Sequence, residues 1–399
     1  MRSVSRTDVL IAGAGLAGAR AAEALRALGF DGRVLVVGDE PHAPYERPAL
    51  SKAVLLGTRE PAGLALRDEG FWSAREIELH TGAGVDSVDV RARRAVVGGR
   101  PLAWRRLVLA TGLRPRRPRV FEGLSNVHCL RTLDDAEALR GGLVPGARLA
   151  VVGAGFIGLE VATAALRLGV DVVAIERSPA PFARSLGPLV GARMAGLARA
   201  AGVELRLAAA VAGVRREGSR LMGLELEGGG LVGCDLALVG VGSEPNAELV
   251  AGQLAIAQDG GVAVDAAGRT AATAVYACGD VASIAAGDGG PGRLEHWTVA
   301  TATGRLVAHS IVGSPAPAPA PAYFWTDQFD SRLQVVGHPG PGLAVQLDES
   351  AGGFVARYRD AAGRVVAIAL LDRPELLAQA REELPGGAAH RSPRGAAAA

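Results

Sequence analysis

The stretch DVLIAGAGLAGARAAEALRALG, residues 8–29, predicts how this chain folds. A short β-branched run leads into a glycine-rich turn and then into an apolar helical pattern that ends at Gly29. The stretch RLAVVGAGFIGLEVATAALRLG, residues 148–169, has the same pattern. A further strand follows each of them, at RVLVVGDE (33–40) and at DVVAIER (171–177). The chain therefore contains two βαβ units, about 140 residues apart.

Composition limits the kinds of protein that this chain can be. Its 399 residues predict two or three domains, and 49% hydrophobic with 21% charged residues supports buried cores. The net charge of +2 gives no reason to expect a nucleic acid or a membrane surface as partner. No apolar run reaches the roughly 18 residues of a membrane span, and the N-terminus lacks a secretory pattern. We therefore expect a cytoplasmic protein.

Two β-rich stretches and two helical segments account for much of the remaining chain. Residues 85–112 and 211–242 alternate as β-meanders do. A strand ends in YACGD, and a helix-like segment follows Asp280. A second helical pattern begins near Trp297 and ends around Gly313.

A proline–alanine segment at residues 315–321 is a stiff connector and marks a domain boundary. Short alternating runs from Tyr323 to Leu371 predict a small sheet, which a helix over residues 374–383 closes. The tail, residues 385–399, has too little apolar bulk to order itself.

The glycine turns predict two dinucleotide sites. Each has the spacing G-x-G-x-x-G directly between a strand and a helix, at Gly13, Gly15 and Gly18 and again at Gly153, Gly155 and Gly158. The first glycine permits the tight turn, the second lets a pyrophosphate approach the backbone, and the third lets the helix pack on the strand. Two such sites in one chain favour one tightly held flavin and one exchanging nicotinamide.

Acidic residues after each unit bear on the nucleotide that binds. Glu176 ends its strand and can accept both ribose hydroxyls, which favours NAD over NADP, although the adjacent Arg177 weakens this exclusion. After the first unit, either Asp39 or Glu40 can meet the ribose of FAD. Asp280, in YACGD, can accept hydrogen bonds from the ribityl chain; the simpler interpretation is a helix N-cap.

The motifs together resemble a known family. They are YERPALSK (45–52), the two glycine turns, GLE (158–160), ATG (110–112), CGD (278–280), EHWTVA (295–300) and YFWTDQFD (323–330). With them the chain resembles the FAD-dependent pyridine-nucleotide reductases of the glutathione-reductase fold, and among these the ferredoxin and putidaredoxin reductase family. The redox-active cysteine pair of the disulfide reductases is absent, because Cys129, Cys234 and Cys278 lie far apart.

The resemblance implies an α/β fold of two Rossmann-like dinucleotide-binding domains and a small α+β C-terminal domain. The expected boundaries are 1–115 with 245–314 for the FAD domain, 116–244 for the NAD domain, 322–384 for the C-terminal domain and 385–399 for a disordered tail.

The resemblance also assigns catalytic roles. Lys52, the only lysine in the chain, corresponds to a lysine beside flavin N5 and would pair with Glu160, the acid of the nicotinamide pocket. Arginine cannot replace a compact ammonium group at such a site. Trp297 would begin a helix that points at the flavin, and Trp325 would cover it. The alternatives are core aromatic residues and a surface acid.

The residues expected to bind each cofactor follow from the motifs and the resemblance. For FAD they are Gly13, Gly15, Leu16, Ala17, Gly18, Asp39, Glu40, Arg47, Pro48, Lys52, Ala110, Thr111, Gly112, Gly279, Asp280, Glu295, His296, Trp297 and Trp325. For NADH they are Gly153, Gly155, Phe156, Ile157, Gly158, Glu160, Glu176, Arg177, Arg184 and Gly242. Ser243 and Glu244 depart from the family pattern beside the nicotinamide pocket.

The implied function is a flavoprotein reductase. It takes a hydride from NADH to FAD and passes single electrons to a [2Fe-2S] ferredoxin that serves a cytochrome P450 or another oxygenase. No cysteine or histidine cluster has metal-ligand spacing, so we expect no metal site, and we expect a monomer. The arginine-rich run at residues 112–120 is either a docking surface for the ferredoxin or a solvated loop.

Three alternatives stay open. The same flavin core could reduce rubredoxin or serve a multi-subunit reductase. It could instead belong to an NADH-responsive interaction protein that resembles apoptosis-inducing factor. A flavin monooxygenase fits less well, since the second βαβ unit and the Lys52–Glu160 pair suit hydride entry from NADH.

Overall fold

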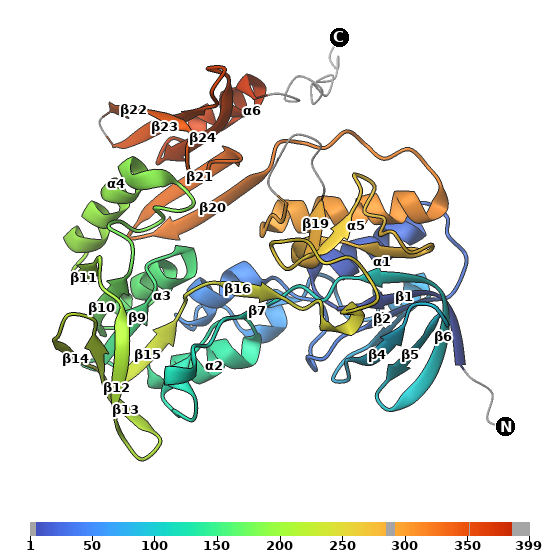
Figure 1. Cartoon of the computed structure of the whole chain (residues 1–399), viewed down its shortest axis with the longest axis horizontal. Coiled ribbons are helices and arrows are strands. Elements are labelled where there is room, and N and C mark those ends of the chain that lie inside the picture. The colour runs from blue at the N-terminus through green and yellow to red at the C-terminus, as the bar shows by residue number, and fades with distance from the viewer. Residues whose placement is uncertain (1–4, 285–291, 351, 385–399) are drawn as a thin grey trace, which may run out of the picture.

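A computed structural model describes residues 5–284, 292–350 and 352–384 (Figure 1). Two α/β units lie side by side, and a C-terminal sheet packs above the second of them (Figure 1). The tail that the sequence predicts to be disordered, residues 385–399, lies outside the described residues.

The first unit contains a mixed sheet of seven strands. Its order is β3 (Ile77–His80), β2 (Val34–Val37), β1 (Ser5–Ala12), β6 (Arg100–Leu109), β5 (Arg94–Val97) and β4 (Val85–Asp89), with β18 (Val275–Ala277) beside β6. Strand β1 is parallel to β2 and β6, and its last four residues are buried. Such a continuous apolar run is typical of a strand covered on both faces. Strands β4 to β6 form the predicted antiparallel meander.

Two helices cover this sheet and pack against each other. They are α1 (Leu16–Ala27) and α5 (Trp297–Val312), which ends at a left-handed Gly313 as predicted. Gly304 of α5 faces α1 directly, because a Cβ atom there would come within 2.4 Å of the Ala17 carbonyl oxygen. The helices can therefore approach closely only with glycine at this position.

The prediction of a helix-like segment after Asp280 is wrong as far as Ile284, and residues 285–291 lie outside the described residues. Residues Gly279–Val281 form a single 3₁₀ turn, and the chain continues at once as strand β19 (Ala282–Ile284), which pairs with β17 (Val262–Val264). The run after Asp280 is rich in β-branched and small residues, and pairing with β17 decides its conformation.

The second unit contains a parallel sheet of five strands. Its order is β11 (Glu204–Leu207), β10 (Asp171–Glu176), β9 (Arg148–Val152), β15 (Leu236–Val239) and β8 (Val127–His128). The helices of this unit are α2 (Leu133–Gly142), α3 (Phe156–Arg167) and α4 (Gly187–Ala200). The predicted meander at 211–242 supplies the antiparallel strands β12 (Val211–Glu217), β13 (Arg220–Leu226) and β14 (Leu231–Gly233), but its last strand, β15, joins the parallel sheet.

A two-stranded ribbon connects the two units. Strand β7 (Leu113–Pro115) carries the chain out of the first unit, and β16 (Ser243–Pro245), which pairs with it in antiparallel register, carries the chain back. The two connections therefore run side by side, as Figure 1 shows at the centre of the molecule.

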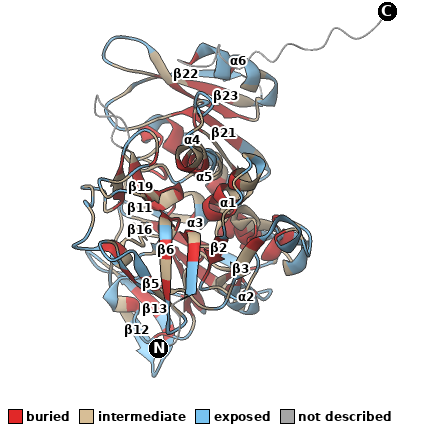
Figure 2. Ribbon diagram, turned by 90° about the vertical axis from the view of Figure 1, so that its right-hand side faces the viewer, coloured by how far each residue is buried: buried red, intermediate tan, exposed pale blue. Residues whose placement is uncertain are grey.

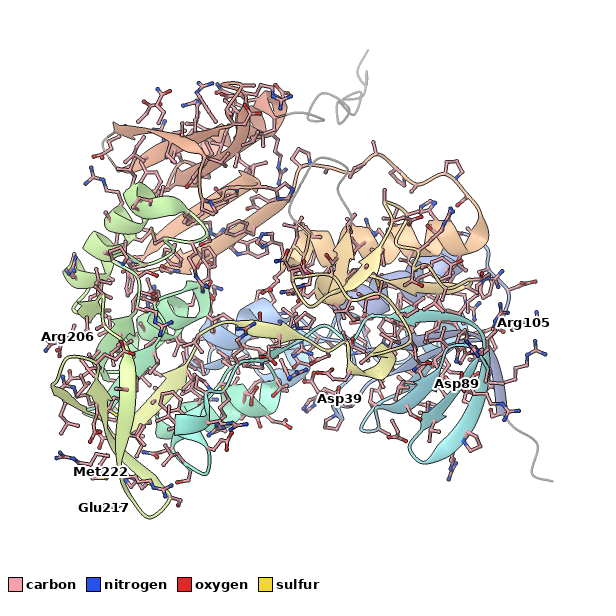
Figure 3. The ribbon with its side chains drawn as sticks, in the orientation of Figure 1. Asp39, Asp89, Arg105, Arg206, Glu217 and Met222 are labelled. Carbon is pink, nitrogen blue, oxygen red and sulfur yellow. The ribbon has the colours of Figure 1, made fainter. Side chains whose placement is uncertain are left out.

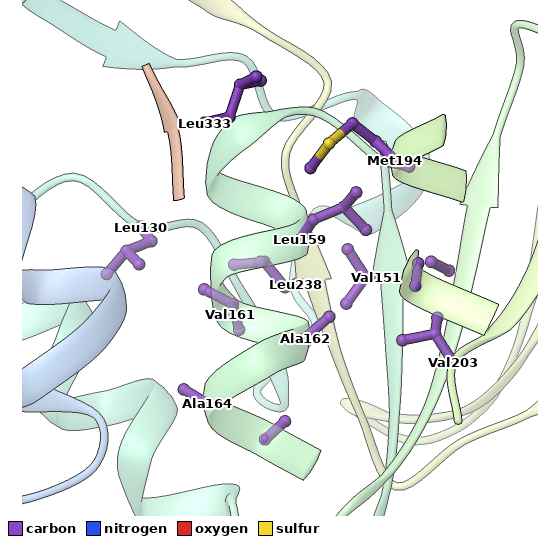
Figure 4. Close-up of a cluster of buried hydrophobic side chains, with 14 of the residues drawn as sticks. Leu130, Val151, Leu159, Val161, Ala162, Ala164, Met194, Val203, Leu238 and Leu333 are labelled. Atoms are coloured by element: carbon purple, nitrogen blue, oxygen red, sulfur yellow. The ribbon is translucent and has the colours of Figure 1, made fainter. Parts of the chain in front are cut away.

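The C-terminal part forms an antiparallel sheet that packs on the second unit. Its strands are β20 (Tyr323–Gln328), β21 (Ser331–Gly337), β24 (Val365–Leu371), β23 (Gly353–Arg359) and β22 (Ala344–Ser350), followed by α6 (Leu377–Glu383) after a 3₁₀ turn, Pro374–Leu376. The buried Tyr358 hydroxyl donates to the Leu186 carbonyl oxygen at 2.8 Å. One hydrophobic core joins the two parts, and Leu333 of β21 lies there near Leu159 and Met194 (Figure 4).

Buried residues are found mainly along the strands of the sheets and on the helix faces that cover them (Figure 2). The exposed rims are charged, with Arg105 and Arg206 at opposite ends of the molecule and Asp39 between them (Figure 3). The predicted fold class is confirmed by this architecture together with the comparisons reported below.

Candidate active site

The first glycine-rich turn lines a pocket, called here the main pocket, and Phe156 and Ile157, which directly follow the second turn, line it as well. Helix α1 begins at Leu16 and α3 at Phe156, and the capping residues Gly15 and Gly155 provide no side-chain cap. The first backbone N–H groups of each helix are therefore left without that partner and form a positive helix end. A Cβ atom built on either glycine meets no atom within 4 Å. A phosphate group fits such an open turn.

The main pocket gathers nearly all residues expected for FAD. Those that line it are Gly13, Gly15, Leu16, Ala17, Asp39, Glu40, Arg47, Pro48, Lys52, Ala110, Thr111, Gly112, Gly279, Asp280, Glu295, His296, Trp297 and Trp325. Gly18 does not line it. A Cβ atom on Gly18 would come within 2.1 Å of the Gly13 carbonyl oxygen, so this glycine lets the helix pack on the turn.

Three residues expected for NADH line the same pocket, namely Phe156, Ile157 and Glu160. Ile157 is 45% exposed and gives the pocket an apolar wall. These three residues therefore meet the set expected for FAD in one cavity, which is what transfer between two stacked rings requires.

A largely buried carboxylate, Asp280, lies just after strand β18 of the first unit. Burial raises the pKa of Asp280, and the Arg131 guanidinium, 3.1 Å from its Oδ2, opposes that rise. Arg131 lines the main pocket as well, and no motif in the sequence pointed to it. A carboxylate acceptor beside a guanidinium donor suits a polyhydroxy chain that carries phosphate.

The predicted ion pair is present. Lys52 Nζ lies 2.7 Å from Glu160 Oε1 and 3.3 Å from the Pro48 carbonyl oxygen. Lys52 belongs to a π-helical turn, Leu50–Val54, and such turns are frequent at functional sites. Glu160 lies one turn into α3 and its side chain is only 8% exposed. An ammonium group next to a buried carboxylate offsets much of the cost of burying that charge.

Two hydroxyl groups that the sequence did not single out complete this pair. Ser51 Oγ donates to Glu160 Oε2 at 2.5 Å, and Thr326 Oγ1 donates to Glu160 Oε1 at 2.7 Å. Gln328 Nε2 in turn donates to Thr326 Oγ1 at 2.9 Å. Each hydroxyl is adjacent to a predicted residue, Lys52 or Trp325, and this adjacency was the available signal.

Glu40 and Asp39, between which the sequence did not decide, differ in their surroundings. Glu40 accepts hydrogen bonds at 2.5 Å from Tyr45 Oη and from Arg47 Nη2. Arg47 Nη1 also donates to the Arg131 carbonyl oxygen. The exposed Asp39 accepts a hydrogen bond from the Glu40 backbone at 3.1 Å. The Asp39 carboxylate therefore has fewer hydrogen-bond partners within the protein. The Glu40 carboxylate instead links Tyr45 and Arg47 in the lining of the pocket.

Aromatic side chains from helix α5, strand β20 and the residue before α5 line part of the main pocket. His296 and Phe324 stack with ring centroids 4.3 Å apart and an interplanar angle of 12°. Burial lowers the pKa of His296 to about 4, so this imidazole is neutral at pH 7. Trp325 of β20 stacks on Tyr323 at 5.8 Å, and Trp297 begins helix α5, as predicted.

The other residues expected for NADH lie outside the main pocket. They are Gly153, Gly155, Gly158, Glu176, Arg177, Arg184 and Gly242. Glu176 nevertheless adjoins the second glycine turn, because its carboxylate accepts hydrogen bonds from the backbones of Ala154 at 2.9 Å and Ser178 at 2.8 Å. Arg177 and Arg184 are exposed.

The arginine-rich run at residues 112–120 has local partners. Arg114 pairs with Glu244 and Glu248 across the β7–β16 ribbon, and Arg117 donates to three backbone carbonyl oxygens. Glu244, noted as a departure from the family pattern, pairs with both Arg114 and Arg116. Glu244 and Glu248 offset at most two of the four arginine charges in this run, so a docking surface and a solvated loop both stay as interpretations.

Two negative findings concern the described residues only. In residues 5–284, 292–350 and 352–384, no group of three or more histidine, cysteine, aspartate or glutamate side chains is placed to hold a metal ion. Within the same ranges, no helix is both long enough and apolar enough to cross a membrane.

Comparisons with known proteins agree with this geometry. Residues 7–304 match the family model of the pyridine nucleotide-disulphide oxidoreductases, and residues 323–398 match the reductase C-terminal model. Over 378 residues the chain is 39% identical to the ferredoxin–NAD(+) reductase component of the p-cumate 2,3-dioxygenase system from Pseudomonas putida, with 94% of this chain and 92% of that protein covered.

Two solved structures have a similar fold. The covalent putidaredoxin reductase–putidaredoxin complex gives a TM-score of 0.90 at 31% identity, covering 95% of this chain and 93% of that chain. The ferredoxin reductase for the CYP199A2 system from Rhodopseudomonas palustris gives 0.87 at 35% identity, covering 92% and 91%.

The fold and its two glycine turns define a pyridine nucleotide-disulphide oxidoreductase. Within that class, the chain belongs to the ferredoxin reductase family with a reductase C-terminal domain. The resemblance that the motifs indicated and the prediction of a ferredoxin–NAD(+) reductase are confirmed.

Proposed function

We propose that this enzyme oxidises NADH through a tightly bound FAD and passes electrons singly to a [2Fe-2S] ferredoxin, which serves a cytochrome P450 or another oxygenase. The observation that carries the proposal is the position of the Lys52–Glu160 pair in the pocket that the first glycine turn and the start of helix α3 both line. The relatives named above, which are reductase components of oxygenase systems, support the ferredoxin as the acceptor.

FAD, when bound, supplies the two-electron to one-electron conversion that no side chain can perform. The main pocket fits this cofactor, since it combines an uncapped helix N-terminus at Leu16, the buried Asp280 and the Arg131 guanidinium. Lys52 would place a positive charge where negative charge develops, and Glu160 would hold the ammonium group in position. Trp297 would add the positive end of α5.

NADH would bind at the second glycine turn, with its nicotinamide against Ile157 and Glu160 in the main pocket. Glu176 would meet the adenosine ribose and disfavour a 2′-phosphate. The full residue sets proposed for FAD and NADH remain those expected from the sequence, with Gly18 and Gly158 acting through helix packing and with Arg131 added to the FAD set.

The proposal includes the domain boundaries expected from the sequence. Two of them, at 115/116 and 244/245, fall in the β7–β16 ribbon where the chain crosses between the sheets. A monomeric state and a cytoplasmic location complete the proposal. Rubredoxin as an acceptor and an NADH-responsive interaction protein stay as alternatives that acceptor assays separate.

The test is a comparison of NADH with NADPH against a panel of ferredoxins and a rubredoxin. We expect fast flavin reduction by NADH and rapid transfer to at least one [2Fe-2S] ferredoxin. Flavin reduction without transfer to any ferredoxin would contradict the proposal. Fast transfer to rubredoxin alone would favour the first alternative, and very slow transfer to every acceptor would favour the interaction protein.

A further inference from the structure

A second pocket, called here the rear pocket, meets the main pocket at the Lys52–Glu160 pair. It provides about 380 Å³ of space that the centres of water molecules can occupy, whereas a single water needs only about 10–15 Å³ of such space. Among the described residues that line the two pockets, Lys52 and Glu160 are the ones shared by both. The ion pair is therefore the wall between them.

One face of helix α3 leads from the main pocket to the rear pocket. Phe156 and Glu160 line the main pocket, and Glu160, Ala164 and Arg167 line the rear pocket. Their spacing of three or four residues aligns them along the helix. The row begins at the buried Glu160 and ends at Arg167, whose side chain is 50% exposed and pairs with Asp330. The rear pocket thus connects the ion pair to solvent.

The lining of the rear pocket is suited to water. Gln328 is 1% exposed, and its Oε1 has no hydrogen-bond partner among the described residues. The Gln328 side chain lines the rear pocket and its Nε2 donates to Thr326 Oγ1 at 2.9 Å, so the polar groups around Glu160 continue into this pocket. The charged side chains that face the rear pocket besides the ion pair are Arg167, Asp327, Asp330, Arg332 and Asp372. They come from α3, from strands β20 and β21 with the turn between them, and from the end of β24.

The proposed reaction releases one proton for each NADH. NADH and two oxidised ferredoxins give NAD⁺, two reduced ferredoxins and one H⁺. The C4–H bond of the dihydronicotinamide breaks, its two electrons end on the two iron–sulfur partners, and its hydrogen nucleus leaves as a proton. In the proposed function FAD and the nicotinamide of NADH occupy the main pocket, so the proton needs a separate aqueous route from the ion pair.

We propose that the rear pocket carries this proton to solvent and that Glu160 passes it from Lys52 to water there; the inference rests on the proposed function. The transfer distance exists already, since Lys52 Nζ and Glu160 Oε1 are 2.7 Å apart. Glu160 gives the proton to a rear-pocket water, and Lys52 regains one from the main-pocket side. Ser51 and Thr326 hold both carboxylate oxygens in place for this transfer.

The test uses the FAD-loaded protein and two variants that fill or dry the rear pocket from opposite walls. Ala164→Leu adds apolar bulk from α3, and Gln328→Leu replaces the amide that β20 contributes to the pocket lining with an apolar side chain. Stopped-flow absorbance follows oxidation of the reduced protein by ferredoxin, while a pH-indicator dye in weak buffer follows proton release. We expect proton appearance to slow by about tenfold or more in both variants, with an increased solvent deuterium isotope effect.

Each variant has a matched control. Ala164→Ser keeps the residue small at the same position and adds no apolar bulk. Gln334→Leu makes the same change at a buried glutamine that hydrogen-bonds Tyr323 Oη at 2.8 Å and is outside the rear pocket. We expect both controls to release protons at the wild-type rate. Wild-type proton release in Ala164→Leu and in Gln328→Leu would overturn the inference, as would equal slowing in the controls.

A second readout does not depend on turnover. A high-resolution crystal structure of the FAD-loaded protein is expected to show ordered waters from Glu160 past Gln328 to the Arg167–Asp330 mouth, and to lack them in Ala164→Leu. A dry or collapsed rear pocket in the wild-type structure would overturn the inference. Failure of the proposed function is distinguishable, because it appears earlier in the same traces as absent flavin reduction by NADH or absent electron transfer to ferredoxin.

Discussion

Thr326 Oγ1 lies 2.7 Å from Glu160 Oε1, although 166 positions separate the two residues in the chain. The strand that bears Thr326 belongs to the C-terminal sheet, and Glu160 belongs to the helix that follows the second glycine turn. The Lys52 ammonium reaches the same oxygen from the first unit, also at 2.7 Å. Three parts of the chain therefore fix one carboxylate, and correct assembly of all three is required to place it.

Thr326→Val is expected to destabilise the protein by about 2 kcal/mol, because a buried carboxylate loses one of its donors. Urea unfolding of the FAD-free protein measures this change in the free energy of unfolding. Thr326→Ser keeps the hydroxyl and should recover most of the loss. Equal stability of Thr326→Val and wild type would show that this hydrogen bond does not hold the two parts together.

Lys52→Arg is expected to slow flavin reduction by NADH about tenfold or more while FAD content stays near wild type. A planar guanidinium is bulkier than an ammonium group and cannot occupy the space between Glu160 Oε1 and the Pro48 carbonyl oxygen in the same way. Anaerobic stopped-flow gives the rate, and the absorbance ratio of flavin to protein gives the content. An unchanged rate would contradict the role given to Lys52.

Glu176→Gln is expected to reduce the preference for NADH over NADPH by about tenfold, which corresponds to about 1.4 kcal/mol. The amide keeps a side chain of the same shape beside the second glycine turn but removes the charge that repels a 2′-phosphate. The ratio of kcat/KM for the two nucleotides is the measurement. Asp171→Asn is the matched control, because it removes one negative charge at the exposed start of the same strand. An unchanged preference in Glu176→Gln would remove Glu176 from the nucleotide site.

His296 makes stability depend on pH in the acid range. Its pKa is about 4 in the folded protein, against 6.5 when unperturbed, and burial is the main cause. Because the folded pKa is depressed, the folded state binds fewer protons below pH 6.5, so stability falls as pH drops from 6.5 toward 4. We expect a loss of about 2 kcal/mol at pH 4.5 from this group alone.

The measurement is urea unfolding at pH 4.5 and pH 7 for wild type and His296→Asn. The variant should lose less stability between the two pH values. His338, whose pKa burial also lowers, contributes in the same direction and stays in both proteins. Equal pH dependence of the two proteins would show that His296 is not held neutral by its burial.

Much of the fold could be predicted from the sequence, because local patterns decided it. The two glycine turns place strand, turn and helix in fixed order, and Gly13 and Gly153 both adopt positive φ values of 118° and 101°. The segment after Asp280 could not be predicted, since strand pairing with β17 decided it. Long-range partners of this kind override local propensity.

The candidate site divides in the same way. Lys52 and Glu160 could be paired from motifs, whereas Ser51 and Thr326 needed the three-dimensional packing that brings their hydroxyls to Glu160. Arg131 has no motif of its own and meets Asp280 only because the two units lie side by side. The rear pocket could not be predicted from the sequence either, because four separate segments of the chain line it.

The central claim is that the main pocket holds FAD and that NADH reduces it for a ferredoxin. The most direct measurement is anaerobic titration of the purified protein with NADH, followed by addition of an oxidised [2Fe-2S] ferredoxin. We predict a yellow protein with one FAD per chain, bleaching by one equivalent of NADH, and reduction of two ferredoxins per NADH consumed. A protein that stays colourless after refolding with excess FAD, or a flavin that NADH does not bleach, would contradict the account.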